Sequence, residues 1–532
     1  MIHTTRSTRA MAVAPHAAAA QSALAILREG GNAIEAMVSA AATISIVYPH
    51  MNGLGGDAFW LIHEPGKPLR AIDGCGAAAG RATREFYRER GREAIPWRGA
   101  LAANTTAGAV SSWELALSIS GAEWSGRMPL ARLLDDAIHY AEHGFAATKS
   151  QSMATCAKLA ELAAQPGFAQ RFLPEGSPPA EGSLFTQKPL AATMRALAKN
   201  GLADFYRGEL AQAICGDLAA IGSPLGPEDF ACHVATQRKP LAMKHSLGML
   251  YNMPPPTQGL MSLLIVGILD RLGFDGMQAE SADYVHLAVE ATKQAFLIRD
   301  QYVTDPSYMK VDAQTLLGAD SLAALAGKID RRKALPWNAP GRGGDTVWMG
   351  AIDGAGRTVS FIQSIYHEFG SGVVLPATGI NWQNRGASFS LDPGALNALT
   401  PLRKPFHTLN PALAIFDDGR AMAYGAMGGD GQPQSQAAVF TRYALFGMGL
   451  QQSVSAPRWL FGRNWGAASA TLKLESRFDE TIVASLKARG HDIEMFADFD
   501  ETMGHAGALV RHPCGIIEGA SDPRSDGAAA GY

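Results

Sequence analysis

The sequence has few cysteines, and no arrangement of them suggests a pairing. Its 532 residues include five cysteines, which lie far apart and contain no C-x-x-C pair. A disulfide framework or a cysteine-based zinc site is therefore not expected, and isolated reduced thiols are typical of a cytosolic protein. The five are Cys75, Cys156, Cys215, Cys232 and Cys514.

An excess of charge of one sign and long apolar runs are also missing. The net charge is −3 and the basic residues are scattered, so we expect neither nucleic acid nor an acidic membrane as a partner. No apolar run is long enough to span a bilayer. Near the N-terminus, His16 and Gln21 interrupt the alanine-rich run that follows Arg6 and Arg9, which does not fit a signal peptide. These features predict a cytoplasmic protein.

What the sequence does have is enough apolar residues for a large, compact protein. Hydrophobic residues make up 47% and charged residues 18% of the chain, and its length predicts more than one ordinary core. Helical spacing dominates the first part, while the last part favours hairpins with a few helices. We therefore expect an α+β fold in which helices cover stacked antiparallel sheets.

Particular segments carry clearer signals. Gly30-Gly31-Asn32 predicts a break between two helices, and a strand is expected from Ala58 to His63. Residues 331–345 are polar with Pro and Gly, which predicts an exposed loop. Hairpins are expected over residues 346–365 and 411–429, a helix over 432–446, and two further strands near 492–499 and 506–521.

The sharpest chemical candidate is Thr346, in the stretch GRGGDTVWMGAID at residues 341–353. Most threonines that open a strand have no chemical role. Here, however, a Gly-rich loop ends directly against the threonine. Its hydroxyl is placed to add to the Asp345 carbonyl and shift the acyl group from N to O, after which water cleaves the ester. The freed α-amine of Thr346 then serves as the base for its own hydroxyl. Whether the Asp345 side chain takes part is not evident from the sequence.

Two other groups of residues have the composition of a site. Gly428 and Gly429 follow a strand and precede a helix, so their N–H groups are candidates for an oxyanion hole, although a simple turn has the same pattern. Two loops, NWQNRGASFS and RKPFHTLNPA, bring polar side chains between apolar runs. Arg385 in the first loop is suited to hold a carboxylate, unless it is an ordinary solvated arginine. The polar residues of the two loops are Gln383, Asn384, Arg385, His407, Thr408 and Asn410.

The order of several motifs resembles the γ-glutamyltransferase family of N-terminal-nucleophile hydrolases over essentially the whole chain. The resemblance implies a four-layer αββα fold and a precursor that is cut before the nucleophile into a large subunit, residues 1–345, and a small subunit, residues 346–532, which stay together. It also implies that Thr346 is the nucleophile and that Gly428 and Gly429 form the oxyanion hole. The matching segments are GGNAIEAMVSAA, GLGGDAFWLI, PPPTQG, YVTDP, GGDTVWMGAID-GAG, FGSGVVLPATGI, LNPALAIF, GAMGGDGQPQ and APRW.

The departures from the family pattern cluster where a glutamyl group would bind. Ser364 replaces the threonine that supports the nucleophile, and Tyr366 replaces an asparagine. The Gln-x-x-Asp that binds the α-amine is Arg385 with Ser388 here, and the two serines that hold the α-carboxylate are His407 and Thr408. The early Arg-Glu-x-Ala-Pro segment becomes DGCGAAAGRA near Asp73, so its arginine is missing or moved.

These departures predict a rebuilt pocket next to a retained catalytic centre. Arg385 would repel a substrate ammonium and favour a small acid without an α-amine. The chain resembles the branch of the family that includes oxamate amidohydrolase, which implies hydrolysis of oxamate to oxalate and ammonia. Arg385 would hold the carboxylate, Asn384, Tyr366, His407 and Thr408 would shape the pocket, and Ser364 would support the Thr346 hydroxyl.

Alternative functions remain at this point. They are a γ-glutamyltransferase or glutathione hydrolase, an acylase on larger amides with a wide pocket around Trp348 and Trp382, and an inactive homologue that binds a small acid. The chemistry requires no metal and no organic cofactor. A homodimer of processed protomers is also a possible assembly.

Overall fold

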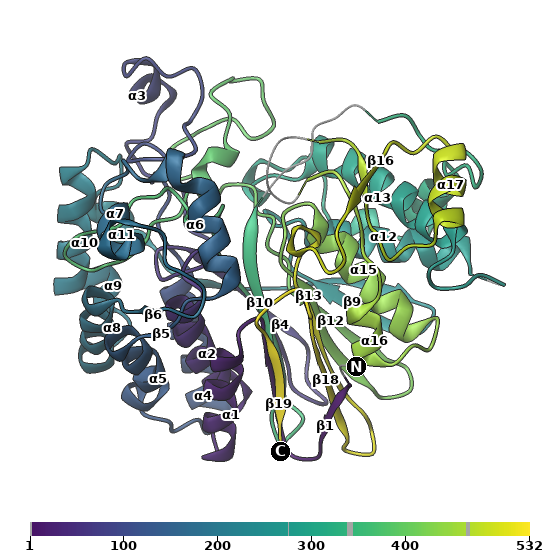
Figure 1. Ribbon diagram of the computed structural model, residues 1–532, viewed down its shortest axis with the longest axis horizontal. Helices are drawn as coiled ribbons and strands as arrows, with labels where there is room; N and C mark the ends of the chain where they lie inside the picture. The colour runs from purple at the N-terminus through teal and green to yellow at the C-terminus, as the bar shows by residue number, and fades with distance from the viewer. Residues whose placement is uncertain (1–2, 275, 338–343, 464–468) are drawn as a thin grey trace.

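The computed structural model describes residues 3–274, 276–337, 344–463 and 469–532. Two seven-stranded antiparallel sheets lie at the centre of the molecule, and helices cover their outer sides (Figure 1). Sheet 1 runs β1 (Thr5–Ser7), β18 (Ile517–Ser521), β17 (Ala506–Arg511), β13 (Ala421–Ala426), β12 (Ala412–Phe416), β9 (Gly248–Asn252) and β8 (Leu241–His245). Sheet 2 runs β19 (Ala528–Gly531), β2 (Met11–Ala14), β10 (Asp345–Ile352), β11 (Thr358–Tyr366), β3 (Asp57–His63), β4 (Arg70–Gly74) and β7 (Thr236–Arg238).

The sheets pack face to face, since β10 contacts both β13 and β17. One helical layer packs on sheet 2 and a second packs on sheet 1, which gives the order helix, sheet, sheet, helix. The first layer contains α1 (Ala17–Arg28), α2 (Ala33–Val47), α4 (Ala109–Glu123), α5 (Leu130–His143) and α8 (Lys188–Asn200). The second contains α12 (Gly259–Leu272), α13 (Ala282–Tyr302), α14 (Ala319–Ala326), α15 (Gly431–Ala444), α16 (Leu450–Ser455) and α17 (Glu480–Ala488).

Smaller elements complete the described chain. Two of them form a two-stranded sheet, β5 (Phe145–Ala146) and β6 (Leu184–Phe185), and three form a small separate sheet, β14 (Trp459–Phe461), β15 (Leu472–Glu475) and β16 (Ile493–Phe496). The remaining α-helices are α3 (Arg84–Arg88), α6 (Lys149–Leu162), α7 (Phe168–Phe172), α9 (Asp204–Arg207), α10 (Glu209–Ala220) and α11 (Pro227–Cys232). The short 3₁₀ turns are η1 (Pro174–Gly176), η2 (Pro306–Tyr308), η3 (Thr315–Leu317), η4 (Arg385–Ser388) and η5 (Glu501–Met503).

Helix α2 shows how local sequence sets the frame for the site. The Asn32 side chain accepts hydrogen bonds from the Ile34 and Glu35 N–H groups, and the Glu35 carboxylate accepts one from the Asn32 N–H. This capping box begins the helix directly after the predicted break. Every residue of α2 is buried, and its alanines allow close packing against sheet 2.

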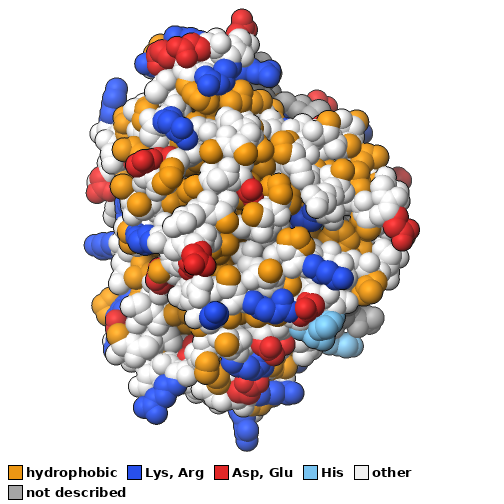
Figure 2. All heavy atoms as spheres, turned by 90° about the vertical axis from the view of Figure 1, so that its left-hand side faces the viewer, with side chains coloured by type: hydrophobic (Ala, Val, Ile, Leu, Met, Phe, Trp, Pro, Cys, Tyr) orange, Lys and Arg blue, Asp and Glu red, His pale blue; other side chains and the backbone are white. Residues whose placement is uncertain are grey.

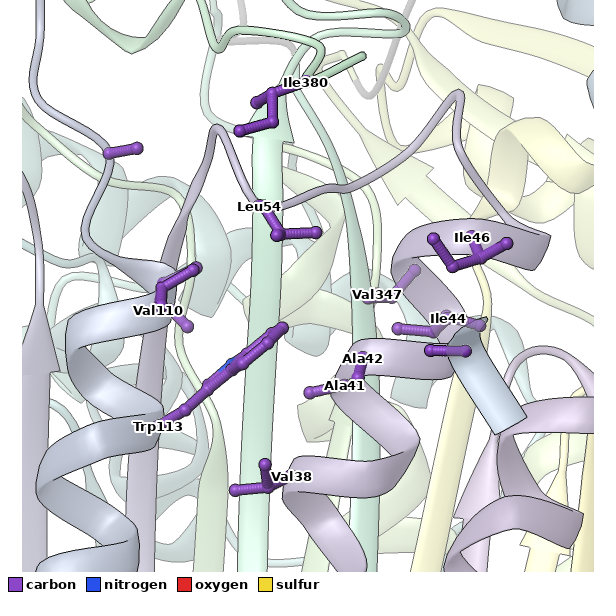
Figure 3. Packing of buried hydrophobic residues seen from close by; sticks show 14 of the residues in the cluster. Val38, Ala41, Ala42, Ile44, Ile46, Leu54, Val110, Trp113, Val347 and Ile380 are labelled. Atoms are coloured by element: carbon purple, nitrogen blue, oxygen red, sulfur yellow. The ribbon is translucent and has the colours of Figure 1, made fainter. Parts of the chain in front are cut away.

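Strand β10 buries residues on both of its faces. Val347, Met349 and Ala351 belong to the apolar cluster that α2 shares with sheet 2, and Figure 3 shows Val347 beside Ile44 of that helix. Trp348 belongs to the cluster between the two sheets. Because side chains alternate along a strand, Thr346 points to the same side as Trp348, toward sheet 1.

The Trp348 ring fills a gap that glycines leave in sheet 1. A Cβ atom added to Gly425 would lie 2.1 Å from Trp348 Cδ1, and one added to Gly507 would lie 2.5 Å from its Cζ3. The indole Nε1 donates a hydrogen bond to Ser360 Oγ at 3.0 Å. The residue two positions after Thr346 is thus locked between the sheets, which fixes this end of β10.

The predicted secondary structure agrees with most of these elements, with two corrections. The single strand predicted over residues 506–521 is a hairpin of β17 and β18, because residues 512–516 form a hydrogen-bonded turn. The α+β class and the predicted hairpins are confirmed. The loop predicted to be exposed over residues 331–345 is only partly so. Residues 331–333, 335 and 336 are exposed, residues 338–343 lie outside the described ranges, and Ala334, Gly344 and Asp345 are buried. Asp345 already belongs to β10, because its backbone pairs with Tyr366.

Charge on the surface and the apolarity of the helices can be described for parts of the chain. On the face in Figure 2, basic and acidic side chains are intermixed, and no band of one sign is visible. Among the helices of the described residues, none has the length and apolarity needed to cross a membrane.

Candidate active site

The Thr346 hydroxyl lies beside the peptide that it is predicted to attack. Thr346 Oγ1 is 2.5 Å from the carbonyl oxygen of Asp345, and the Ser364 hydroxyl also donates a hydrogen bond to this oxygen. The described contact of Ser364 is thus to the carbonyl, whereas the sequence predicted support of the Thr346 hydroxyl. A donor on a carbonyl oxygen stabilises the negative charge that develops when a nucleophile adds to the carbon.

A β-bulge brings Ser364 to this position. Asp345 pairs with Tyr366 but Val347 pairs with Gln363, so β11 has one extra residue at this point. Tyr366 adopts a positive φ of 84°, and its N–H donates to Ser364 Oγ at 2.7 Å. The bulge therefore fixes the Ser364 hydroxyl as an acceptor from Tyr366 and a donor to the carbonyl.

A chain of amide side chains also reaches the Thr346 hydroxyl. Gln432 Nε2 donates to Thr346 Oγ1 at 3.3 Å, and Gln432 Oε1 accepts from Asn410 Nδ2 at 3.1 Å. Asn410 Nδ2 also donates to the Thr408 carbonyl, and Asn410 Oδ1 accepts from Ser262 Oγ. Because Gln432 Oε1 accepts from Asn410, the Nε2 end of the Gln432 amide faces Thr346.

Gly428 and Gly429 lie just before α15, as predicted. Their φ values are 105° and 24°, a region that suits glycine. The Gly429 N–H donates to the Gly344 carbonyl oxygen at 2.6 Å. In the uncut chain, the predicted oxyanion donor is therefore occupied by the segment that precedes the candidate nucleophile.

Arg385 is buried and only partly paired. It has no solvent exposure, its Cζ lies 4.0 Å from the centre of the Tyr366 ring, and its Nη1 is 3.4 Å from Thr408 Oγ1. Its Nε and Nη2 have no hydrogen-bond partner among the described residues. Burial lowers the pKa of Arg385 to about 10, so the side chain remains charged at neutral pH. Two charged N–H groups are thus left for an anion.

His407 stands beside this arginine as a neutral group. Burial lowers the pKa of His407 well below its ordinary value. Its Nε2 lies 3.3 Å from Asp57 Oδ2, while Asp57 Oδ1 accepts from the Gly76 and Gly108 N–H groups at 3.0 Å each. Burial raises the pKa of Asp57 to about 7, so this acid compensates only part of the arginine charge at neutral pH.

Asn384 is held by the backbone around it. Its Oδ1 accepts from the His367 N–H at 3.2 Å, and its Nδ2 donates to the Trp97 carbonyl at 3.0 Å. The structure therefore brings together Tyr366, Arg385, His407 and Thr408. The described contacts of Asn384 are instead with the backbone of His367 and Trp97, which holds its loop in place.

Two groups of side chains have the composition of a metal site, but their environment is unfavourable. Ligand atoms of Asp57, Cys75 and His407 lie within 4.8 Å of one another. Burial raises the pKa of the Cys75 thiol, which keeps it protonated, and the charge of Arg385 opposes a cation. In the second group, His286 hydrogen bonds to His491 at 2.8 Å and Glu290 pairs with Lys293 at 2.7 Å, so the ligand atoms are already used.

Several residues of the site were not assigned from the sequence. Asp57 was visible as a charged residue that opens an otherwise apolar strand, and Gln432 lies inside the motif GAMGGDGQPQ. Nothing local marks Gly344 as a residue that blocks the site, because its partners Gly429, Tyr366 and Thr408 come from other parts of the chain.

Two stacked sheets between helical layers, with a threonine at the start of a central strand, are the architecture of an N-terminal-nucleophile hydrolase. The model of the gamma-glutamyltranspeptidase family matches residues 19–532, and the chain belongs to this family. The predicted family is thereby confirmed, and with it the predicted class of enzyme, a γ-glutamyltransferase-like amidohydrolase.

Individual relatives cover the chain almost completely. The oxamate amidohydrolase proenzyme of Klebsiella pneumoniae is 58% identical over 99% of both chains. The glutathione hydrolase-like YwrD proenzyme of Bacillus subtilis is 40% identical over 98% of both chains. The crystal structure of the cephalosporin acylase from Bacillus halodurans superposes with a TM-score of 0.90 and 33% identity, covering 100% of this chain and 97% of that one.

Proposed function

We propose that the chain cuts itself between Asp345 and Thr346 and that the processed protein hydrolyses oxamate to oxalate and ammonia. The cut would yield fragments 1–345 and 346–532. The contact of two hydroxyls, those of Thr346 and Ser364, with the Asp345 carbonyl oxygen supports this cleavage point. The carbonyl carbon is only one C=O bond, about 1.2 Å, from that oxygen.

The same hydroxyl then becomes the nucleophile of the processed enzyme. The freed Thr346 α-amine takes the hydroxyl proton as Oγ1 adds to the substrate amide carbon. N–H groups of Gly428 and Gly429 stabilise the oxyanion, and ammonia leaves with a proton returned by the amine. Water hydrolyses the acyl-enzyme ester and regenerates Thr346. Gln432, which already contacts Oγ1, orients the hydroxyl.

The observation that carries the choice of substrate is the buried, partly unpaired Arg385. A buried charge is costly unless an opposite charge meets it, and its free Nε and Nη2 match the two oxygens of a carboxylate. Oxamate is a primary amide joined directly to a carboxylate. Its small size suits a site in which Tyr366 and Thr408 contact the arginine. The name of the 58% identical Klebsiella relative supports the same substrate.

The alternatives fit these residues less well. A γ-glutamyl substrate carries an α-ammonium that Arg385 would repel. An acylase with a wide pocket around Trp348 and Trp382 is disfavoured, because Trp348 is 3% exposed between the sheets and Trp382 is fully buried, with its Nε1 donating to the Thr105 carbonyl. An inactive homologue has no need for the ordered Thr346 hydroxyl. Cytoplasmic location and a homodimer remain predictions.

The test measures ammonia release from oxamate and, separately, hydrolysis of a γ-glutamyl anilide by the processed protein. We expect turnover of oxamate and little or none of the anilide. Arg385→Leu should lower kcat/KM for oxamate by about 100-fold, since a lost charge-assisted hydrogen bond costs about 3 kcal/mol. Arg385→Lys keeps the charge but loses the paired N–H groups of the guanidinium. Its kcat/KM for oxamate should lie between the values for wild type and Arg385→Leu.

Arg195→Ala is the control for loss of a positive charge, because Arg195 is exposed and pairs with Glu142. Self-cleavage should persist in all three variants. Good turnover of the γ-glutamyl anilide, or unchanged oxamate turnover in Arg385→Leu, would contradict the proposed substrate.

A further inference from the structure

The residue before the proposed cleavage point carries a buried acid that the proposed function does not use. Asp345 is 1% exposed, and neither of its carboxyl oxygens accepts a hydrogen bond from an N–H or hydroxyl group of the described residues. Glu368, which is 3% exposed, follows two residues after Tyr366, the strand partner of Asp345, and its carboxyl group interacts with that of Asp345. Burial, and next the charge of Glu368, raise the pKa of the Asp345 carboxyl well above its ordinary value. The Asp345 carboxyl therefore binds a proton more tightly in the uncut chain than it would in water.

Little positive charge is available to balance a further acid here. Lys158 of α6 places its Nζ 4.0 Å from Glu368 Oε1. Burial keeps the adjacent His367 neutral by lowering its pKa well below the ordinary value. Other titratable or charged groups of the described residues that act on the acid pair or on His367 include Glu501 of η5, Tyr48 after α2, Arg463, and Arg98, whose Nη1 donates to the Glu368 backbone carbonyl.

Gly344 and Asp345, the short segment before the proposed cleavage point, cover the candidate pocket. The Gly344 carbonyl accepts the Gly429 N–H at 2.6 Å. A Cβ atom on Gly344 would lie 3.1 Å from the Tyr366 ring and 3.3 Å from Thr408 Oγ1, so this glycine rests directly on the pocket wall. A substrate can reach the oxyanion donor only after Gly344 and Asp345 have left.

We propose that the buried acid pair of Asp345 and Glu368 drives the end of the large fragment out of the substrate pocket once the chain is cut. This inference rests on the proposed cleavage between Asp345 and Thr346. In the final step, water adds to the ester carbon and the bond from this carbon to Thr346 Oγ1 breaks. One proton returns to Oγ1, and the other leaves the new α-carboxyl group.

The new α-carboxyl group of Asp345 destabilises the buried position of this residue. An α-carboxyl has a pKa of about 3.5 and is ionised at neutral pH. It is the third acid in a place where Lys158 is the neighbouring cation, and burying an unpaired charge is costly. Leaving the pocket exposes both acids of Asp345 to water and frees the Gly429 N–H. Self-cleavage thereby opens the site that it creates.

The direction of the pH dependence follows from the carboxyl titrations. At low pH all three acids bind protons and the repulsion is lost. As pH rises through the carboxyl range toward the raised pKa of Asp345, the acids ionise and the segment is expelled more strongly. We expect slower clearing at pH 5 than at pH 8.

The experiment follows cleavage and clearing separately in the maturing full-length protein. A denaturing gel gives the fraction of cut chain. Carboxypeptidase Y then trims the new C-terminus only if it is exposed, and loss of Asp345 from the mass of the large fragment reports trimming. This readout does not depend on the substrate. Oxamate turnover in the same aliquots reports opening of the pocket.

The variants are Glu368→Gln and Asp345→Asn, each of which removes one acid of the pair with little change in shape. We expect both to be cut, while trimming and the onset of activity lag behind cleavage by roughly tenfold, the effect of one pKa unit of interaction. Asp417→Asn is the matched control. Asp417 lies in the turn between β12 and β13, where it is exposed and pairs with exposed Lys244, and this variant should behave as wild type.

Trimming that keeps pace with cleavage in both variants, as in wild type, would overturn the inference. Folded variants that remain uncut would also overturn it, because the acid pair would then act in cleavage itself. An uncut wild-type chain would instead refute the proposed cleavage point, and the gel distinguishes this result from the other two.

Discussion

Ser364 and Thr346 direct their hydroxyls at one carbonyl oxygen, and this shared contact assigns them different roles. Thr346 is bonded through its own nitrogen to the carbonyl carbon that it is proposed to attack. Ser364 comes from the neighbouring strand and can stabilise only the oxygen. Its hydroxyl also accepts from the Tyr366 N–H, so the donor is already oriented before the reaction begins.

At this scale we predict that Ser364→Ala slows self-cleavage by about 100-fold, the usual effect of losing one donor at an oxyanion. Ser364→Thr keeps a hydroxyl and should restore most of the rate. The measurement is the fraction of uncut chain over time on a denaturing gel. Thr358→Ala is the control on the same strand, since the Thr358 hydroxyl contacts the Gly356 carbonyl at the end of β11 far from Thr346. Equal rates in Ser364→Ala and wild type would remove Ser364 from the proposed mechanism.

Individual residues could be predicted from the sequence only where a motif marked them. Arg385, His407 and Thr408 lie in two loops with recognisable composition, and Tyr366 was marked by its departure from the family pattern. The structure places these residues together. The acid pair had no such signal, because Asp345 and Glu368 meet only when β10 pairs with β11 and both side chains are buried. Burial and charge balance are properties of the folded chain.

Among the elements, β10 connects the site to the core. Trp348 fixes the strand between the sheets, and sheet 1 accepts the ring only because Gly425 and Gly507 lack side chains. The sequence predicted this hairpin and its position. It did not predict that the strand begins at Asp345, since the buried start depends on contacts with Gly429 and Tyr366 from distant segments.

At the element scale we predict that Gly425→Ala lowers the free energy of unfolding by about 3 kcal/mol, because its methyl group would overlap the Trp348 ring in a fully packed interior. Chemical denaturation of the protein measures this change. Gly121→Ala in α4 is the control, since a Cβ there meets no atom within 4 Å. That variant should be neutral or more stable by up to about 1 kcal/mol. Equal denaturation midpoints for the two variants would contradict the packing role assigned to Trp348.

For the whole molecule, the topology explains how a cut chain stays one protein. In sheet 2, β10 lies between β2 of the large fragment and β11, and β11 in turn pairs with β3 of the large fragment. In sheet 1, β12 of the small fragment pairs with β9 of the large one. Both sheets are therefore shared, so the proposed fragments cannot separate without losing strand pairing and the core between the sheets.

The central claim is that Thr346 becomes a new N-terminus, and the mass of the denatured fragments tests it most directly. Wild-type protein should elute from a native sizing column as one species and then give two masses on denaturation, those of residues 1–345 and 346–532. The smaller fragment should begin Thr346-Val347-Trp348, and Thr346→Ala should remain a single uncut chain. An intact wild-type chain that hydrolyses oxamate, or a cut at any other bond, would contradict the account.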